Sequence, residues 1–420
     1  MKNILTILFV VTSTLSFSQN NNQIIGETFI KLLLQEKNYQ EAHSYFDETV
    51  KNKISVKLLE DAELQLANQL GRFNAVIEVN NENDTYFYYS DFEKMKLDVK
   101  ITFNVDNKII GFFFTPHKEF KKTNSLGKDL NIRSGNIDLK GTILIPENDN
   151  LKKLVLFVHG SGPQDRDETI FENKPFKDIA ESLLAKGIAS YRFDKRTLTN
   201  PESFKENSTI DDEVTDDIVN IINFFKEDSQ FEDYEITVLG HSLGANLLPR
   251  IANRSNHIVK VVLMAGNARP LEVLVAEQYD YIYKLNPSEE VLEAVNKVKE
   301  QIAFLKSKNF NVTAPKDKLP FNLSGYYWQS LLDYNPLKEI KKVKTPILVL
   351  QGERDYQVTM KDFELWKSAL KNNDKATFIS YPKLNHLFMT GEGISEPKEY
   401  LAKANVNATV IADIYNFVKK

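Results

Sequence analysis

The sequence has 420 residues, more than one hydrophobic core usually organises, so we expect two domains. Its 58 acidic residues against 53 Lys and Arg give a net charge of -5, and nothing in this balance favours nucleic acid as a partner. There is no cysteine, which excludes disulfides, cysteine-ligated zinc and a thiolate nucleophile. A covalent nucleophile must therefore be another residue type.

The first 18 residues have the pattern of a signal peptide. Lys2 supplies a positive charge, Ile4 to Val11 form an apolar run, and Ser16-Phe17-Ser18 places small residues ahead of Gln19. The run is too short to span about 30 Å of hydrocarbon, which argues against a membrane anchor. We predict cleavage before Gln19 and export to the periplasm or beyond, with no integral membrane segment after cleavage.

Residues 19–117 predict a small α+β domain. Apolar residues are spaced as in helices from about Ile24 to Phe73. In the later part of this range we predict one apolar face formed by Leu58, Leu59, Leu64 and Leu66. Four β-rich runs separated by turn residues follow: Ala75–Val79, Thr85–Ser90, Met95–Phe103 and Lys108–Phe114. Helices followed by an antiparallel meander indicate a separate core. Residues 118–131 are the predicted linker.

From residue 132 to 420 strands and helices alternate, after an antiparallel edge hairpin predicted for Ile137 to Ile145. Mostly apolar strands in such an order predict an α/β fold with a parallel sheet covered on both faces. The expected strands are 154–158, 188–193, 235–239, 259–264, 346–350 and 376–380. The expected helices are 175–186, 211–226, 242–252, 360–370 and a last one ending at Val418.

An insertion at about 269–344 interrupts this alternation. Val291, Val295, Val298 and Ile302 keep one helical face apolar, and Tyr326, Tyr327 and Trp328 form an aromatic group that we assign to packing within the insertion. Because the segment lies between two core strands, it should cover the carboxyl ends of the sheet. We therefore predict a helical cap.

Gly240-His241-Ser242-Leu243-Gly244 fits the pattern G-x-S-x-G. An apolar strand, Ile236 to Leu239, runs into it and a helix follows, which is the strand-turn-helix setting of a nucleophilic serine. The sharp turn needs room on both sides, which Gly240 and Gly244 leave. Ser242 is therefore the predicted nucleophile.

A serine hydroxyl needs a base, and the base needs a carboxylate to orient it. Of the six histidines, only His386 follows the last core strand, at the sheet edge where Ser242 lies; the side chain of His241 should diverge from Ser242. The other four are His43 and His117 in the first domain, His257 in a loop and His159 at a strand end. Asp355 follows the strand 346–350 and is the predicted acid, with Glu353 as its competitor.

Hydrolysis also needs N–H donors where negative charge develops on the substrate oxygen. One should be the backbone N–H of Leu243, directly after the nucleophile. The other should come from His159-Gly160-Ser161-Gly162, after the first parallel strand, as the N–H of Ser161. The loop can also be read as a tight glycine turn, and both interpretations are compatible.

Several segments in order carry a family resemblance: His159 to Asp167, Arg192 to Arg196, Gly240 to Gly244 and Gly352 to Asp355. Together they resemble the bacterial α/β-hydrolase esterases related to the prolyl-oligopeptidase branch, over about Ile132 to Lys420. The resemblance implies hydrolysis of carboxylic esters, often with short acyl groups, and no cofactor or metal. The first domain resembles the cystatin-like or nuclear-transport-factor-like (NTF2-like) modules that precede some bacterial hydrolases.

Other functions stay open on the same scaffold. An aminopeptidase or dipeptidyl peptidase ranks lower because no propeller-sized domain is present, while thioesters and acylated glycans remain possible substrates beside small esters. Asp165, Arg166 and Asp194 are interpreted as a charge network that shapes loops. An envelope binding protein is the hypothesis from another class, and the complete set of Ser242, Asp355 and His386 argues against it. Oligomeric state is not predicted.

Overall fold

The computed structural model describes residues 22–82, 84–118 and 126–420, so the predicted signal peptide lies outside it. These residues divide into two compact units, with the boundary between Ser125 and Leu126. Within the described ranges no helix has the length and apolar character needed to cross a bilayer. The two units are treated separately below.

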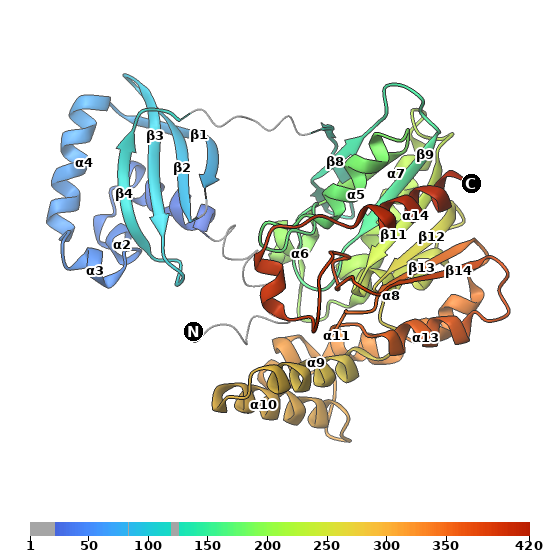
Figure 1. Cartoon of the computed structure of the whole chain (residues 1–420). Coiled ribbons are helices and arrows are strands. Elements are labelled where there is room, and N and C mark those ends of the chain that lie inside the picture. The colour runs from blue at the N-terminus through green and yellow to red at the C-terminus, as the bar shows by residue number, and fades with distance from the viewer. Residues whose placement is uncertain (1–21, 83, 119–125) are drawn as a thin grey trace. The chain divides into compact units, whose positions relative to one another are not determined.

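The first unit packs helices against a four-stranded antiparallel sheet with strand order β1-β2-β3-β4 (Figure 1). Neighbouring strands pair in sequence order, which confirms the predicted meander and the small α+β domain. Its core contains Phe29, Phe46, Tyr88, Val99 and Ile101. The elements are a helix over 22–30, η1 (Lys31–Gln35), α2 (Tyr39–Ser44), α3 (Glu48–Lys51), α4 (Val56–Leu70), β1 (Phe73–Glu82), β2 (Thr85–Phe92), β3 (Lys96–Phe103) and β4 (Ile109–Thr115).

The apolar face of α4 differs from the prediction. Leu58 and Leu64 are 52% and 46% exposed, whereas the buried residues are Leu59, Glu63 and Leu70. These three residues are four and seven positions apart and so share one face of the helix. The middle one, Glu63, is charged, and a pattern of apolar residues does not include it. Glu63 is accommodated because it accepts a hydrogen bond from the Tyr39 hydroxyl at 2.9 Å.

The second unit is built on an eight-stranded sheet of order β14-β13-β12-β11-β9-β10-β8-β5 (Figure 1). The six strands from β14 to β10 are parallel, and β8 is antiparallel to β10. β5 falls in the predicted linker range. The strands are β5 (Lys128–Asp129), β8 (Gly141–Leu144), β9 (Lys153–Val158), β10 (Ala189–Phe193), β11 (Glu235–His241), β12 (Ile258–Met264), β13 (Ile347–Gly352) and β14 (Ala376–Tyr381).

The hairpin predicted for Ile137 to Ile145 is wrong. β7 (Ile137–Leu139) pairs with β6 (Ile132–Ser134) in a separate two-stranded sheet, and β8 pairs with β5 and β10 instead. The division falls at Gly141, where a Cβ atom would come within 2.3 Å of the Tyr191 hydroxyl oxygen. Here the chain enters the large sheet close against the Tyr191 ring.

Helices cover both faces of the large sheet, as predicted. Alternation along β9 shows this, since Leu154 and Leu156 pack in one core and Val155 and Phe157 in the other. One face carries α7, α8 and α13, and the opposite face carries α5 and α14. The bounds are α5 (Pro175–Leu184), α6 (Arg196–Thr199), η2 (Pro201–Ser203), η3 (Asp211–Thr215), α7 (Asp216–Glu227), α8 (Leu243–Ala252), α13 (Met360–Ala369), η7 (Pro397–Leu401) and α14 (Ala408–Lys419).

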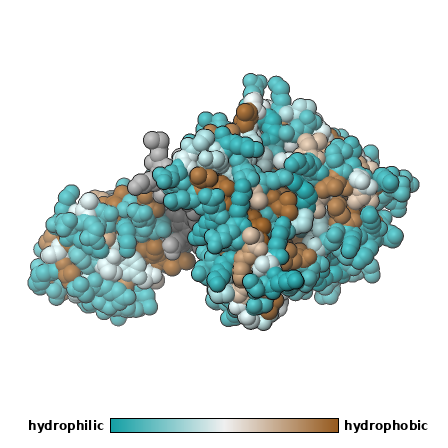
Figure 2. Space-filling view, turned by 90° about the horizontal axis from the view of Figure 1, so that it is seen from below, coloured by the Kyte–Doolittle hydropathy of each residue, from teal (hydrophilic) through white to brown (hydrophobic). Residues whose placement is uncertain are grey.

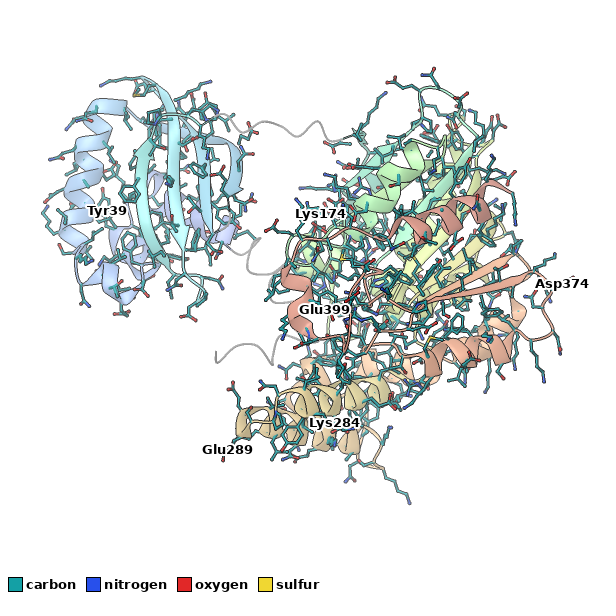
Figure 3. All side chains as sticks on the ribbon, in the orientation of Figure 1. Tyr39, Lys174, Lys284, Glu289, Asp374 and Glu399 are labelled. Carbon is teal, nitrogen blue, oxygen red and sulfur yellow. The ribbon has the colours of Figure 1, made fainter. Side chains whose placement is uncertain are left out.

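The insertion forms a helical cap. Its helices α9 and α10 lie side by side, and Figure 3 labels Lys284 and Glu289 where the chain turns from one to the other. The apolar side of α10 is buried as predicted, and Trp328 packs within the insertion. Tyr327 differs from the prediction, because it is buried in the main core of the unit against Phe204. The elements are α9 (Leu271–Leu285), α10 (Glu289–Leu305), η4 (Lys316–Lys318), η5 (Pro320–Asn322), α11 (Gly325–Asp333), α12 (Pro336–Glu339) and η6 (Ile340–Lys342).

The core fixes where the cap begins. Asp362 of α13 is buried and accepts hydrogen bonds from the backbone N–H groups of Ala268 and Arg269, each at 3.0 Å. The Arg269 guanidinium also pairs with Asp362 at 2.8 Å. The first turn of α9 is therefore held at a defined place on the sheet.

On the face shown in Figure 2, hydrophobic side chains form small patches separated by hydrophilic ones.

Candidate active site

Ser242 lies on a sharp turn between β11 and α8. Its backbone angles are φ 52° and ψ -118°, a region that residues with a side chain seldom adopt. The turn is held on both sides, because the Ser242 N–H donates to Met264 O at 3.0 Å and the Asn246 N–H donates to Ser242 O at 3.0 Å. The serine is thereby lifted out of the sheet at the N-terminus of α8.

The flanking glycines are needed for the packing of this turn. A Cβ atom on Gly240 would come within 2.6 Å of the Gly244 carbonyl carbon, and one on Gly244 within 2.2 Å of the Val158 carbonyl oxygen. In each case the obstacle is backbone, which cannot move aside as a flexible side chain would. The room that the sequence motif implied is thus present in the structure.

His386 and Asp355 meet in loops that follow β14 and β13. His386 Nδ1 donates to Asp355 Oδ2 at 2.6 Å, and both side chains are buried. The other carboxylate oxygen of Asp355 accepts the backbone N–H groups of Gln357 at 2.8 Å and Val358 at 3.0 Å. With its proton on Nδ1, His386 has Nε2 free to accept a proton.

Glu353 lies apart from this pair. Its carboxylate accepts a hydrogen bond from the Ser380 hydroxyl at 2.8 Å at the exposed surface. His159 is buried between the rings of Phe176 and Phe193, and burial lowers its pKa to about 4. A neutral, apolar setting of this kind does not suit a proton shuttle.

The loop after β9 lies against the nucleophile. A Cβ atom on Gly160 would lie 3.3 Å from Ser242 Cβ, and Gly160 and Ser161 line one pocket together with Ser242 and His386. Leu243 is the first residue of α8, so its N–H has no partner within the helix. Both predicted oxyanion donors therefore belong to elements that border the serine.

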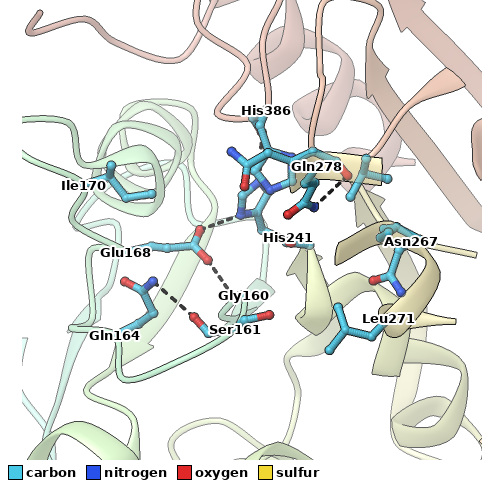
Figure 4. A pocket seen from close by; sticks show the side chains of 14 residues that line it. Gly160, Ser161, Gln164, Glu168, Ile170, His241, Asn267, Leu271, Gln278 and His386 are labelled. Carbon is cyan, nitrogen blue, oxygen red and sulfur yellow. Dashed lines mark hydrogen bonds and ion pairs between the residues drawn. The ribbon is translucent and has the colours of Figure 1, made fainter. Parts of the chain in front are cut away.

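A buried pair that sequence reasoning missed connects these loops (Figure 4). Glu168 accepts the Gly160 N–H at 2.6 Å and faces His241 Nδ1 at 3.1 Å, and His241 Nε2 donates to His386 O at 2.9 Å. The side chain of His241, predicted to diverge from Ser242, lines the same pocket. A carboxylate eight residues after Gly160 belongs to no motif, so nothing in the sequence marked Glu168 as the partner of His241.

Burial alone would lower the pKa of His241, but the facing Glu168 carboxylate and the His386 carbonyl raise it above the ordinary value of 6.5. Burial alone would raise the pKa of Glu168, and the positive His241 lowers it instead. Both imidazole nitrogens face acceptors, as an imidazolium requires. The pair is therefore an ion pair beside the serine.

The predicted loop network is also in place. Arg166 donates to Asp194 Oδ2 at 2.7 Å, and Asp165 accepts the Thr169 N–H at 2.8 Å. Lys195, next to Asp194, is fully buried and donates to Gly160 O at 3.0 Å and to Glu213 Oε1 at 2.6 Å. The sequence offered Lys195 only as part of the family resemblance, without a role.

The pocket around Ser242 is small, about 40 Å³, and the cap forms one wall of it. Leu271, Leu274 and Gln278 line it from α9, at positions that share one helical face. Ile170 and Val358 add apolar surface from the body of the unit. The site therefore combines a serine, an imidazole and a mixed polar and apolar wall.

Comparison with known proteins agrees with this geometry. The model of the alpha/beta hydrolase family matches residues 155–404, and the chain is 32% identical over 399 residues to Esterase EstD of Thermotoga maritima, covering 92% of this chain and 93% of that protein. The chain belongs to the α/β-hydrolase family. The predicted resemblance to its esterases is confirmed, and the protein is a carboxylesterase of this fold.

Other likenesses are more limited. A family model described as a protein of unknown function, DUF3887, matches residues 27–112 of the first unit. The acylamino-acid-releasing enzyme of Rattus norvegicus is 34% identical over 70 residues, only 10% of its length. Among solved structures, Est1E from Butyrivibrio proteoclasticus is 16% identical with a TM-score of 0.46, covering 70% of this chain and 96% of its own. The family assignment rests on the sequence relationship.

Proposed function

We propose that this carboxylesterase works through an acyl-enzyme on Ser242, with His386 as its base and Asp355 as the acid that orients His386. The Ser242 hydroxyl oxygen attacks the ester carbonyl carbon while its proton passes to His386 Nε2. The resulting oxyanion accepts the N–H groups of Leu243 and Ser161. The imidazolium then gives its proton to the leaving alcohol, and the acyl group stays on Ser242.

Deacylation repeats these steps with water. His386 takes a proton from a water molecule as it attacks the acyl carbon, the oxyanion forms again, and collapse releases the carboxylic acid and Ser242. Ser242 lies at the N-terminus of α8. The N-terminal end of a helix is electropositive, so it favours the negative charge of the oxyanion. No cofactor enters any of these steps.

The observation that carries the proposal is that His386, bonded to Asp355 at 2.6 Å, lines the same pocket as the strained Ser242. Ser242→Ala should lower kcat on nitrophenyl acetate by about 10⁶. The variant should also fail to react covalently with a fluorophosphonate that labels the wild type. A folded Ser242→Ala protein with undiminished turnover would refute the assignment.

We extend the proposal to short acyl groups. A pocket of about 40 Å³ has room for roughly three water molecules, which suits an acetyl or propanoyl group better than a long chain. In a series of nitrophenyl esters, kcat/KM should be highest for acetate or propanoate and fall for octanoate. A maximum at octanoate would contradict this part of the proposal.

Export is proposed from the Lys2-led apolar run alone. Protein isolated from its native compartment should begin near Gln19 and be recovered outside the cytoplasm. N-terminal sequencing that finds Met1 in this material would contradict it.

A further inference from the structure

Two buried charges hold the backbone at Gly160, one on the peptide group before it and one on the Gly160–Ser161 peptide group after it. Glu168 accepts the Gly160 N–H at 2.6 Å, and the Lys195 ammonium donates to the Gly160 carbonyl oxygen at 3.0 Å. Glu168 and Lys195 are only 1% and 2% exposed. Glycine has more accessible backbone conformations than other residues, so without such contacts the Gly160–Ser161 peptide could adopt several orientations.

Each charge has its own buried partner. Glu168 faces His241 at 3.1 Å, and Lys195 is bonded to Glu213 at 2.6 Å, where the Tyr327 hydroxyl also donates to Glu213. Isolated charges would be too costly to bury, whereas paired ones are tolerated. Lys195 is therefore fixed by a network that reaches α11 in the cap.

The direction of the Ser161 N–H follows from the carbonyl that Lys195 holds. No described peptide bond is cis, and in a trans peptide the C=O and N–H groups point in opposite directions. The carbonyl of Gly160 points to Lys195, which does not line the pocket, so the Ser161 N–H points the other way. Gly160 and Ser161 both line the pocket of Ser242.

From this geometry we infer that Lys195 is a positioning residue for the oxyanion hole: by holding the Gly160 carbonyl it keeps the Ser161 N–H aimed at the oxyanion. Glu168 fixes the preceding His159–Gly160 peptide by accepting the Gly160 N–H. If the Gly160–Ser161 peptide turned over, a carbonyl oxygen would face the oxyanion and repel it. The inference rests on the proposed function, because it assigns a support to the Ser161 donor.

Lys195→Met tests this, since methionine keeps an unbranched apolar chain and loses the donor. We expect kcat on nitrophenyl acetate to fall by about 10² with KM changed less than about threefold, as for the loss of one oxyanion donor. Affinity for trifluoroacetone, whose carbonyl carbon bonds to Ser242 Oγ and leaves an oxyanion, should fall in parallel. The serine proton passes to His386 in that adduct.

Arg196→Met is the matched control. Arg196 is the next residue and pairs with buried Asp217, but it does not contact Gly160. This variant also loses a buried ion pair, so it should lose stability and keep kcat and trifluoroacetone affinity within about threefold of the wild type. If Lys195→Met is too unstable, Lys195→Met with Glu213→Gln removes both charges and leaves Tyr327 an amide to donate to.

Unchanged kcat and inhibitor affinity in the folded Lys195 variant would overturn the inference, and so would equal losses in the Arg196 control. Ser242→Ala distinguishes a failure of the proposed function from a failure of the positioning role of Lys195. If that variant stays active, the proposed function fails, whatever Lys195 does. If it is inactive while the Lys195 variant keeps full activity, only the positioning role fails.

Discussion

At the scale of single residues, the protonation of His241 depends on one neighbouring carboxylate. In Glu168→Gln the negative charge is lost, so burial dominates and the pKa of His241 should fall below 6.5. Because the pKa of His241 is raised in the folded protein, the ion pair contributes stability that is lost as the pH rises through this pKa. Because the pKa of Glu168 is lowered, that stability is also lost as the pH falls through the pKa of Glu168.

The difference in unfolding free energy between wild type and Glu168→Gln should therefore be largest between these two pKa values and shrink on either side. Denaturant unfolding at a series of pH values measures it, and NMR titration of the imidazoles gives the pKa of His241 directly. The charge of Asp355 also acts on His241 and His159 also acts on Glu168, so both residues are kept unchanged in the comparison. An unchanged His241 pKa in the variant would contradict the ion pair.

The choice of acid can be tested at the same scale. Asp355→Asn should lower kcat by about 10³ to 10⁴, because the amide no longer stabilises the imidazolium form of His386. Glu353→Gln should stay within about threefold of the wild type, since the exposed Glu353 carboxylate bonds to Ser380 and not to His386. Steady-state kinetics on nitrophenyl acetate compares them, and a greater loss for Glu353→Gln would reverse the assignment.

At the scale of elements, helix α9 carries a polar group into the pocket. The Gln278 amide nitrogen donates to Gln357 O at 2.9 Å, and because a carbonyl only accepts, the amide oxygen must face the other way, as Figure 4 shows. This oxygen is buried, and no described protein group donates to it. An ester with a hydroxyl or amide N–H beside the scissile bond would supply the donor.

Gln278→Met should therefore lower kcat/KM about tenfold more for hydroxyethyl acetate than for propyl acetate, which lacks the donor. Methyl hydroxypropanoate and methyl butanoate differ in the same way on the acyl side of the ester. Comparing the two pairs of esters shows whether Gln278 contacts the alcohol side or the acyl side. Leu274→Met, on the same face of α9, is the control and should leave both ratios unchanged. Equal losses on all four esters would rule out a role of Gln278 in specificity.

Elements whose pattern is local were predictable from the sequence, and contacts between them were not. The strands β9 to β14 are short apolar runs bounded by turn residues, and the motif around Ser242 needs only its neighbours. Lys195 meets Gly160 across 35 residues and Gln278 meets Gln357 across 79, with no spacing that marks either pair. On α4 the buried Glu63 misled a search based on apolar residues alone.

At the scale of the whole molecule, the two units have separate cores, and every residue assigned to catalysis lies in the second. A chain beginning at Leu126 keeps β5, which pairs with β8, so it should fold and hydrolyse nitrophenyl acetate with kcat/KM within about threefold of the full chain. Circular dichroism establishes folding before kinetics are compared. A folded but inactive truncated chain would show that the first unit completes the site.

The backbone at Ser242 also limits how stable the enzyme can become. A residue with a side chain at φ 52° and ψ -118° is strained by about 1–3 kcal/mol, which lowers the free energy of unfolding by that amount. Glycine would relieve that strain but has no hydroxyl. Selection for stability and selection for turnover therefore act in opposite directions at this one position, and stability must be gained at other positions.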